Sequence, residues 1–157
     1  MASKATIAKV VAIHVTDRGS GAMRVIQSTR AVKGRGIEGD RYYAATGTYT
    51  GRPGSGRQVT LIESEAIRAV AKDYRIRVAA KDTRRNLLTQ GVALNHLVGR
   101  TFRVGGATLR GTRLCEPCNH LESLTCKGIR AAFVHRGGLR ADIVRSGVIR
   151  AGDSIRI

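Results

Sequence analysis

The sequence predicts one mostly β, barrel-like domain with two or three short helices. Short β-branched segments recur along the chain, glycines separate many of them, and only one segment has a strong helical pattern. No alternation of strands and helices of the βαβ kind is visible, which argues against a doubly wound parallel sheet. The 157 residues have the length of one ordinary domain, so we expect a single domain over 1–157.

The expected strands are short and are bounded by turn residues. They lie at 5–15, 23–32 and 58–62, on both sides of Gly105 and Gly106, and on both sides of the turn at Ser146 and Gly147. The pair around Gly105 and Gly106 is predicted to be a hairpin. Segment 48–57, TYTGRPGSGR, is rich in Gly, Pro and Ser, and we expect a surface loop there.

Segment 63–74, ESEAIRAVAKDY, has the strongest helical pattern. Ser64 is expected to cap this helix, and acidic residues in the first turn favour it. A single helical turn is expected at 93–99, ending at Gly99. Segment 75–91 is ambiguous between strands and a loop.

Composition restricts the compartment. Hydrophobic residues make up 42% and charged residues 25%, as in globular proteins. No apolar run is long enough to cross a bilayer, and the first residues lack a signal-peptide cleavage pattern. Three cysteines do not suggest a disulfide framework. We therefore expect a cytoplasmic protein in a reducing compartment, with no membrane partner.

The net charge of +17 suggests a nucleic-acid hypothesis. The basic residues are, however, spread along the chain, and aromatic residues that could stack on bases make up only 4%. No helix-turn-helix or zinc-finger pattern is present. A small anionic ligand or a solvated surface explains the charge equally well. A non-enzymatic basic module that binds nucleic acid or another polyanion remains an alternative.

The stretch LCEPCNHL, residues 114–121, carries the clearest chemical signal. Proline favours the first position of a helix, so we expect a helix from Pro117 with Cys118 in its first turn. The N–H groups there favour a thiolate, so Cys118 is a better nucleophile or soft-metal ligand than Cys115, which we expect at a strand end. The alternative is that both cysteines are small, partly buried apolar residues.

Two other uses of these cysteines are open. A zinc site would need four ligands, drawn from Cys115, Cys118, Cys126, His120 and His135. The spacing to Cys126 is not that of a zinc knuckle, and a domain of this size does not need zinc to fold. A redox disulfide between Cys115 and Cys118 lacks a surrounding thioredoxin-like pattern.

Four motifs, in this order and at these spacings, make the sequence resemble the MOSC domain, a family named after the C-terminal part of molybdenum cofactor sulfurase. They are GIEGDRY at 36–42, RQVTLIESEAI at 57–67, the stretch from RRNLL to LCEPCNHL at 84–121, and GGLRADIVRSGVIRAGDSIRI at 137–157. The resemblance covers most of the chain. We expect a small stand-alone member, without the pyridoxal-phosphate domain of the sulfurases.

The resemblance implies a fold similar to the pyruvate-kinase type of β-barrel and binding of the molybdenum cofactor, molybdopterin. In amidoxime-reducing members the second cysteine of this stretch ligates molybdenum, and Cys118 occupies that position. An arginine and an asparagine of those members contact the phosphate-bearing pterin and match Arg84 and Asn86, with Arg85 in place of a proline. The alternatives are a solvated arginine at Arg84 and a turn residue at Asn86.

Asp40 and Arg57 are further candidates for the cofactor pocket. Asp40 could hydrogen-bond the pterin or handle a proton, or it could hold its own loop through an Asx turn. Arg57 could reach the pocket from the start of its strand, or pair with Asp40. Gly137 and Gly138 are expected to serve a tight turn, and Arg140 receives no assigned role.

The leading hypothesis is a molybdenum-cofactor protein that supports the reduction of N-hydroxylated compounds, with Cys118 as catalytic residue and molybdenum ligand. No flavin, haem or nicotinamide motif is recognisable, so a separate redox partner protein would supply electrons. The alternative is sulfur carriage, in which Cys118 forms a persulfide and passes its sulfur on for metal-sulfur cluster or cofactor assembly.

Overall fold

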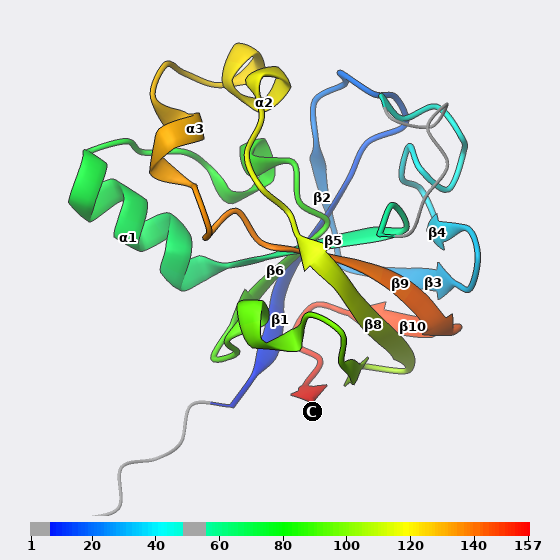
Figure 1. Cartoon of the computed structure of the whole chain (residues 1–157). Coiled ribbons are helices and arrows are strands. Elements are labelled where there is room, and N and C mark those ends of the chain that lie inside the picture. The colour runs from blue at the N-terminus through cyan, green and yellow to red at the C-terminus, as the bar shows by residue number, and fades with distance from the viewer. Residues whose placement is uncertain (1–6, 49–55) are drawn as a thin grey trace, which may run out of the picture.

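The computed structural model describes residues 7–48 and 56–157, which form two β-sheets with short helices on one side (Figure 1). The strands of the larger sheet are β1 (Lys9–Val15), β2 (Arg24–Ile26), β5 (Val59–Glu63), β6 (Leu87–Gln90), β7 (Thr101–Val104), β8 (Ala107–Leu114), β9 (Leu139–Arg145) and β11 (Ile155–Arg156). The smaller sheet consists of β3 (Ser28–Val32), β4 (Gly36–Ile37) and β10 (Gly147–Arg150). The helices are α1 (Ser64–Tyr74), α2 (Asn119–Leu124) and α3 (Ile129–Ala132), with 3-10 turns at Ala80–Thr83 and Leu94–Leu97.

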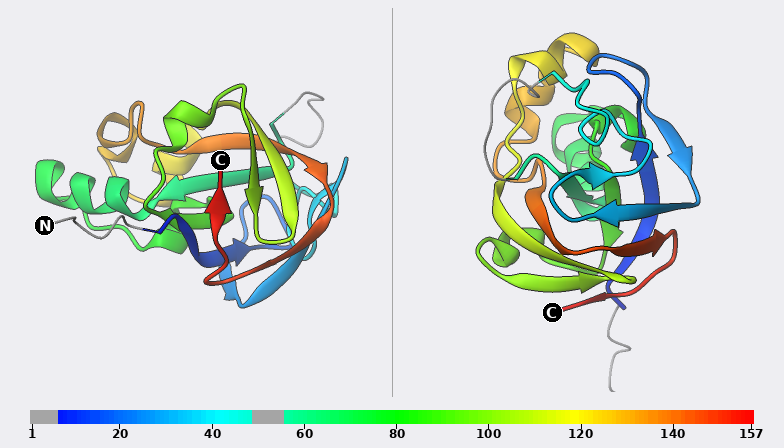
Figure 2. Two further views of the ribbon diagram at one scale, coloured as in Figure 1. Left: turned by 90° about the horizontal axis from the view of Figure 1, so that it is seen from below. Right: turned by 90° about the vertical axis from the view of Figure 1, so that its right-hand side faces the viewer.

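The larger sheet is strongly curled, in the order β11-β7-β8-β9-β5-β6-β1-β2 (Figure 2). Near the start of β1, the N–H of Val10 donates to the carbonyl of Asp153 at 2.9 Å, and the N–H of Ile155 donates to the carbonyl of Ala8 at 2.8 Å. These bonds bring β1 beside β11 without a continuous ladder. The prediction of a mostly β, barrel-like fold is confirmed, although the sheet is not closed.

Two apolar clusters hold this architecture together. The cluster inside the curled sheet includes Ile13, Leu61, Leu87, Phe102 and Leu139. The cluster between the sheet and the helices includes Ile62, Val70, Leu88, Leu121 and Phe133. Neighbouring residues of β5 and β6 point into different clusters, so both faces of these central strands are covered. That is why Leu61 and Ile62 of β5, and Leu87 and Leu88 of β6, are consecutive apolar residues that do not alternate with polar ones, and why Thr60 is buried as well.

The sequence predicted that no βαβ unit is present, and this prediction is wrong at one place. β5 and β6 are parallel, with Leu61 opposite Leu87 and Ile62 opposite Leu88, and α1 lies in the connection between them. A parallel pair needs such a crossover. The unit is hard to see in the sequence because β6 is only four residues long and is buried on three of them, which removes the alternating pattern.

The helix boundaries differ from the prediction by one residue at α1. The N-cap is Glu63, the last residue of β5, and Ser64 is the first helical residue, with its hydroxyl bonded to Glu65. The strand runs directly into the helix, which leaves no separate position for a capping serine. The helical turn expected at 93–99 is confirmed as Leu94–Leu97, followed by Gly99 at φ +79°. The helices of the described part are too short or too polar to cross a bilayer.

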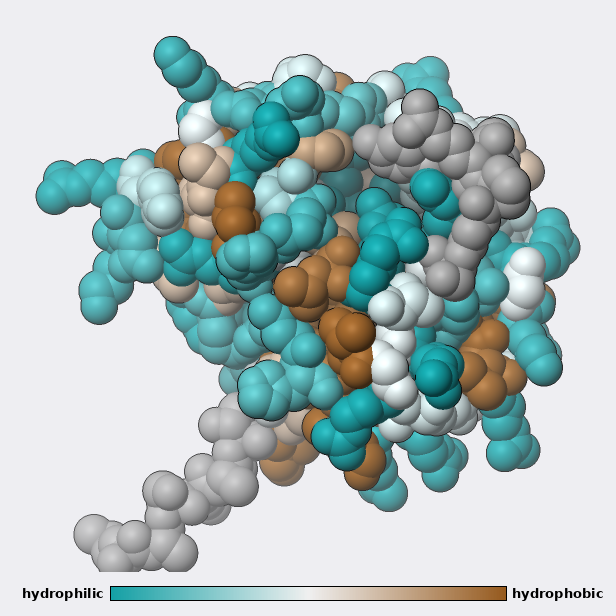
Figure 3. Space-filling model, viewed as in Figure 1, coloured by the Kyte–Doolittle hydropathy of each residue, from teal (hydrophilic) through white to brown (hydrophobic). Residues whose placement is uncertain are grey.

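The predicted strands near the termini are present with one subdivision. The segment 23–32 is divided at Gln27, so that β2 pairs with β1 while β3 pairs with β10 in the other sheet. The hairpin around Gly105 and Gly106 is confirmed as β7 and β8, with Phe102 opposite Leu109. Most of the expected surface loop at 48–57 lies outside the described residues. Figure 3 shows a mainly hydrophilic face on which apolar side chains form only small groups.

Candidate functional site

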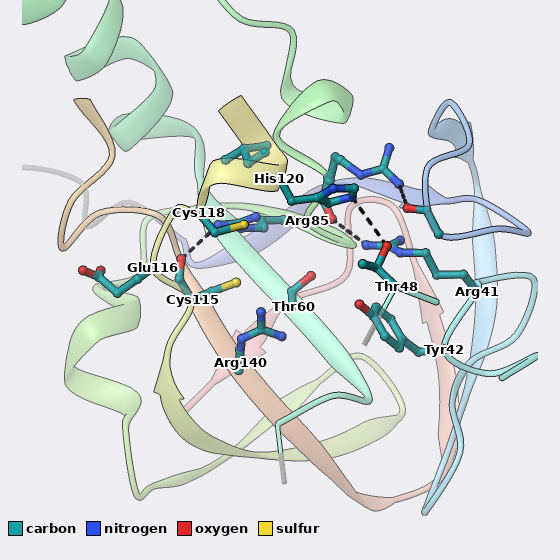
Figure 4. A pocket seen from close by; sticks show the side chains of 13 residues that line it. Arg41, Tyr42, Thr48, Thr60, Arg85, Cys115, Glu116, Cys118, His120 and Arg140 are labelled. Carbon is teal, nitrogen blue, oxygen red and sulfur yellow. Dashed lines mark hydrogen bonds between the residues drawn. The ribbon is translucent and has the colours of Figure 1, made fainter. Parts of the chain in front are cut away.

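A pocket of about 490 Å³, including its open mouth, lies where β5, β9 and the segment before α2 meet the loops that follow β1 and β4 (Figure 4). Its lining includes two cysteines and four arginines: Cys115, Cys118, Arg41, Arg84, Arg85 and Arg140. Glu116 is the only carboxylate among the lining residues within the described ranges. The pocket is therefore strongly cationic and suits an anionic ligand.

The two cysteines occupy different positions at this pocket. Cys115 follows the last residue of β8, as predicted. It is 1% exposed, and its N–H donates to the carbonyl of Gly138 at 2.7 Å. Cys118 is partly exposed and is the N-cap of α2, with an extended backbone at φ −134°. The predicted helix thus begins two residues later than expected, and Cys118 precedes its first turn. None of the described cysteines is in a disulfide.

Arg85 fixes the backbone around the cysteine stretch. Its side chain is buried, and three of its nitrogens donate to main-chain carbonyls: Nε to Gly137 at 2.8 Å, Nη2 to Cys115 at 2.9 Å and Nη1 to Thr83 at 3.0 Å. Charge-assisted bonds of this kind are among the stronger hydrogen bonds in proteins. A Cβ on Gly137 would lie 2.4 Å from the Cys115 carbonyl oxygen, so only glycine allows this close approach. Arg85, which stands where the resemblance led us to expect a proline, therefore connects the segments of Thr83, Cys115 and Gly137.

Arg84 reaches the pocket, but its guanidinium also holds a loop. Nη1 donates to the carbonyl of Gly21 and Nη2 to that of Gly19, both at 2.7 Å. The backbone of Arg84 is left-handed, at φ +66°. Burial, followed by the neighbouring charge of Arg41, lowers the pKa of Arg84 from its ordinary value. Its predicted contact with a pterin phosphate stays a prediction.

Asn86 is buried behind the pocket rather than among its lining residues. Its Oδ1 accepts from the N–H of Thr60 at 3.0 Å and from the Thr60 hydroxyl at 3.2 Å, and its Nδ2 donates to the carbonyl of His14 at 3.2 Å. The amide thus links β5, β6 and β1 at the floor of the site. Its predicted role as a cofactor contact also stays a prediction, and the geometry gives it a positioning role through Thr60.

Asp40 lies beneath Arg41 and is 1% exposed. Its Oδ1 accepts from the N–H of Thr16 at 3.2 Å and pairs with Arg41 Nη1 at 3.1 Å, while its Oδ2 has no hydrogen-bond partner within the described residues. The ion-pair partner of Asp40 is therefore Arg41, its neighbour in sequence. Arg57 precedes β5 outside the pocket lining, close enough to Arg113 for its charge to contribute to the lowered pKa of Arg113.

The residues proposed for zinc are not gathered together. Cys126 lies in a separate surface pocket with Arg77 and Asp82, and Glu116 pairs with His135 at 3.3 Å. His120 lines the cysteine pocket, with its Nε2 3.5 Å from the hydroxyl of Thr48. Across residues 7–48 and 56–157, no group of three or more His, Cys, Asp or Glu side chains is placed to hold a metal ion.

His14 is expected to make stability depend on pH. The ring is buried beneath the site, with Nδ1 3.0 Å from the carbonyl oxygen of Arg85, and desolvation by burial lowers its pKa from the ordinary value of 6.5. The unfolded chain therefore binds this proton more readily than the folded chain, and stability falls as the pH drops below about 6.5. Urea unfolding at pH values of about 7 and 5 should show a smaller loss in His14→Gln than in the wild type. Equal losses in the two proteins would contradict this assignment.

Sequence reasoning did not identify Arg41 or Arg85 as pocket residues, and it assigned no role to Arg140. No sequence signal separates them from the other arginines of this basic chain, because their positions depend on contacts between distant segments. Arg85 reaches carbonyls at Cys115 and Gly137, and Arg41 reaches the carbonyl of Arg84. Cys118 was found because its stretch has a local pattern.

Comparison with known proteins gives a family match and several similar folds. The family model of the MOSC domain matches residues 46–156. The crystal structure of the YuaD protein from Bacillus subtilis has a TM-score of 0.78 and 17% identity, covering 96% of this chain and 94% of that one. YiiM from Geobacillus stearothermophilus has a TM-score of 0.73 and 15% identity, covering 95% and 74%. YiiM from Escherichia coli has a TM-score of 0.66 and 17% identity, covering 94% and 68%. No curated protein sequence matched the chain.

Proposed function

Because the chain belongs to the MOSC domain family, we propose that it binds the molybdenum cofactor in the Cys118 pocket and supports the reduction of N-hydroxylated compounds. The observation that carries the proposal is a partly exposed cysteine in a pocket with four arginines. A thiolate is a soft ligand that suits molybdenum, and guanidinium groups suit a phosphate. With Asp40 paired to Arg41 and Glu116 in the described lining, two carboxylates stand against four arginines, so the pocket keeps an excess of positive charge.

The donor set of the pocket fits such a cofactor. Cys118 would be the metal ligand, and the arginine side of the pocket would face the phosphate-bearing pterin. When bound, the cofactor supplies a redox-active metal centre that can accept an oxygen atom. The buried Cys115 is held by Gly138 and Arg85, and this keeps Cys118 at the edge of the pocket.

The protein's own residues have separate tasks in this proposal. Reduction of N–OH to N–H consumes two electrons and two protons and releases water, and His120 places an imidazole among the lining residues where a proton would be needed. Asp40 and Arg41 would hold the loop wall in place as an ion pair. The electrons would come from a separate redox partner protein.

The test is the molybdenum content of protein purified from a host that makes the cofactor. Wild type and Cys126→Ser should carry nearly one molybdenum per chain, whereas Cys118→Ser should carry almost none. Serine is well accepted as an N-cap, so the variant should fold. Cys126 is the matched control because it is exposed and lies in another pocket. Equal molybdenum in Cys118→Ser and wild type would refute the proposal.

Sulfur carriage is the second candidate, because nearby guanidinium groups favour the thiolate that a persulfide requires. In that case the purified protein would hold no molybdenum. Mass spectrometry after incubation with a cysteine desulfurase would show a gain of one sulfur atom, which Cys118→Ser would lose. A chain that gains no sulfur would rule this candidate out.

A further inference from the structure

The four arginines of the pocket differ in how their donors are used. Arg85 donates to three backbone carbonyls and Arg84 to two. Arg41 pairs with Asp40 and donates to the carbonyl of Arg84. By contrast, the guanidinium of Arg140 makes no hydrogen bond or ion pair with any residue in 7–48 or 56–157. It is therefore the arginine of this lining whose donors remain available to a ligand.

The backbone holds Arg140 firmly in position. In β9 it is paired with Arg113 of β8 on one side and with Thr60 of β5 on the other, and its carbonyl accepts from the Thr112 hydroxyl at 3.1 Å. Figure 4 shows its side chain extending toward Cys115 and Thr60, whereas Arg41 enters from the opposite, loop side. A rigid strand position with unused donors is suited to binding an anion in a defined place.

The charges around Arg140 increase its attraction for an anion. Arg113 lies directly opposite on the neighbouring strand, and like charges in such a pair destabilise a sheet. The pKa of Arg113 is lowered first by desolvation and then by the charges of Arg140 and Arg57. The carboxylate of the same strand, Asp142, accepts from the N–H of Gly56 at 2.7 Å. An anion beside Arg140 would relieve this repulsion.

We propose that Arg140 is the oxyanion-binding residue of the pocket and takes a phosphate or carboxylate group of the bound ligand. The planar guanidinium can bind either group through two parallel hydrogen bonds. The assignment rests on the proposed function only for the source of that group, which is the cofactor or an anionic N-hydroxylated substrate. It differs from the expectation that Arg84 and Asn86 hold the phosphate, because the amide of Asn86 and both Nη atoms of Arg84 are bonded to the protein.

The first experiment uses the cofactor-free chain and inorganic phosphate. Phosphate is titrated at constant ionic strength and followed by amide chemical shifts in NMR spectra. Arg140→Gln should weaken phosphate binding about tenfold or more, since a hydrogen bond to a charged group contributes roughly 1.5–3 kcal/mol. Arg145→Gln is the matched control: it removes the same charge from the same strand at an exposed position and should change the affinity less than about twofold.

Unchanged binding in Arg140→Gln, or an equal loss in Arg145→Gln, overturns the proposal. Neither variant should have a thermal midpoint below that of the wild type, because Arg140→Gln removes a like-charge pair and Arg145 is exposed, so a loss of binding would not reflect unfolding. Failure of the molybdenum test leaves this experiment intact because no cofactor is used.

Cofactor-loaded protein then identifies the source of the oxyanion. Loss of molybdenum from Arg140→Gln assigns the subsite to the cofactor. Retained molybdenum, with a KM that rises for a carboxylate-bearing substrate and not for a neutral one, assigns it to the substrate. A variant that shows neither change contradicts the role of Arg140 in the loaded pocket.

Discussion

Arg85→Met is expected to lower the free energy of unfolding by about 3–5 kcal/mol. The substitution leaves three carbonyl oxygens, those of Thr83, Cys115 and Gly137, without their donor in a buried region. Each unsatisfied buried group costs about 1–3 kcal/mol, and partial relaxation of the loops reduces the sum. Urea unfolding measured by circular dichroism gives the change directly.

Two other variants make this result specific. Arg85→Lys keeps the charge but cannot bond three carbonyls at once, so it should lose an intermediate amount of stability. Arg68→Met removes an exposed arginine that pairs with Glu65 at 3.7 Å, and its effect should stay within about 0.5 kcal/mol. If Arg85→Met were as mild as Arg68→Met, the three bonds would not stabilise the fold.

Gly138→Ala is expected to cost about 2–5 kcal/mol, the sum of backbone strain and overpacking. Gly138 has φ +110°, and an added Cβ would lie 2.0 Å from the carbonyl oxygen of Leu61 in β5. That contact would force apart the pairing of β5 and β9 beside the pocket, so a variant that still folds should also bind less molybdenum. The same unfolding experiment measures the stability change.

Gly152→Ala separates the two causes. Gly152 also has a positive φ, +94°, but nothing lies within 4 Å of an added Cβ. Only the strain remains, about 1–2 kcal/mol. A loss in Gly138→Ala no larger than that in Gly152→Ala would show that β5 and β9 can move apart without further cost.

Local patterns predicted much of the fold. The hairpin at Gly105 and Gly106, the helical turn before Gly99 and the helix at 63–74 all have signals within a few neighbouring residues. The parallel pairing of β5 with β6 was missed, because a short strand that is buried on both faces has no alternating pattern. The cap of α1 was misplaced by one residue, because β5 runs into the helix without a loop.

In the candidate site, too, local features could be predicted from the sequence and contacts between distant segments could not. Cys118 could be singled out from its own stretch, since the nearby proline and the helix that follows are local features. Arg84 and Arg85 are neighbours of the same type, yet one holds the loop at Gly19 and Gly21 while the other holds Cys115 and Gly137. No property of the two residues by themselves predicts this difference.

The sequence by itself indicated the family, through motifs that resemble it, the mostly β class, through local propensity, and Cys118 of the pocket lining, through the pattern of its own stretch. Only the tertiary structure decided which arginines are bonded to the protein and which one faces the pocket with unused donors. The physical reason is that the acceptors for Arg84 and Arg85 are backbone carbonyls of distant segments, brought close only when the sheet curls. Arg140 has no such acceptor within the described residues, and that distinguishes it from the arginines around it.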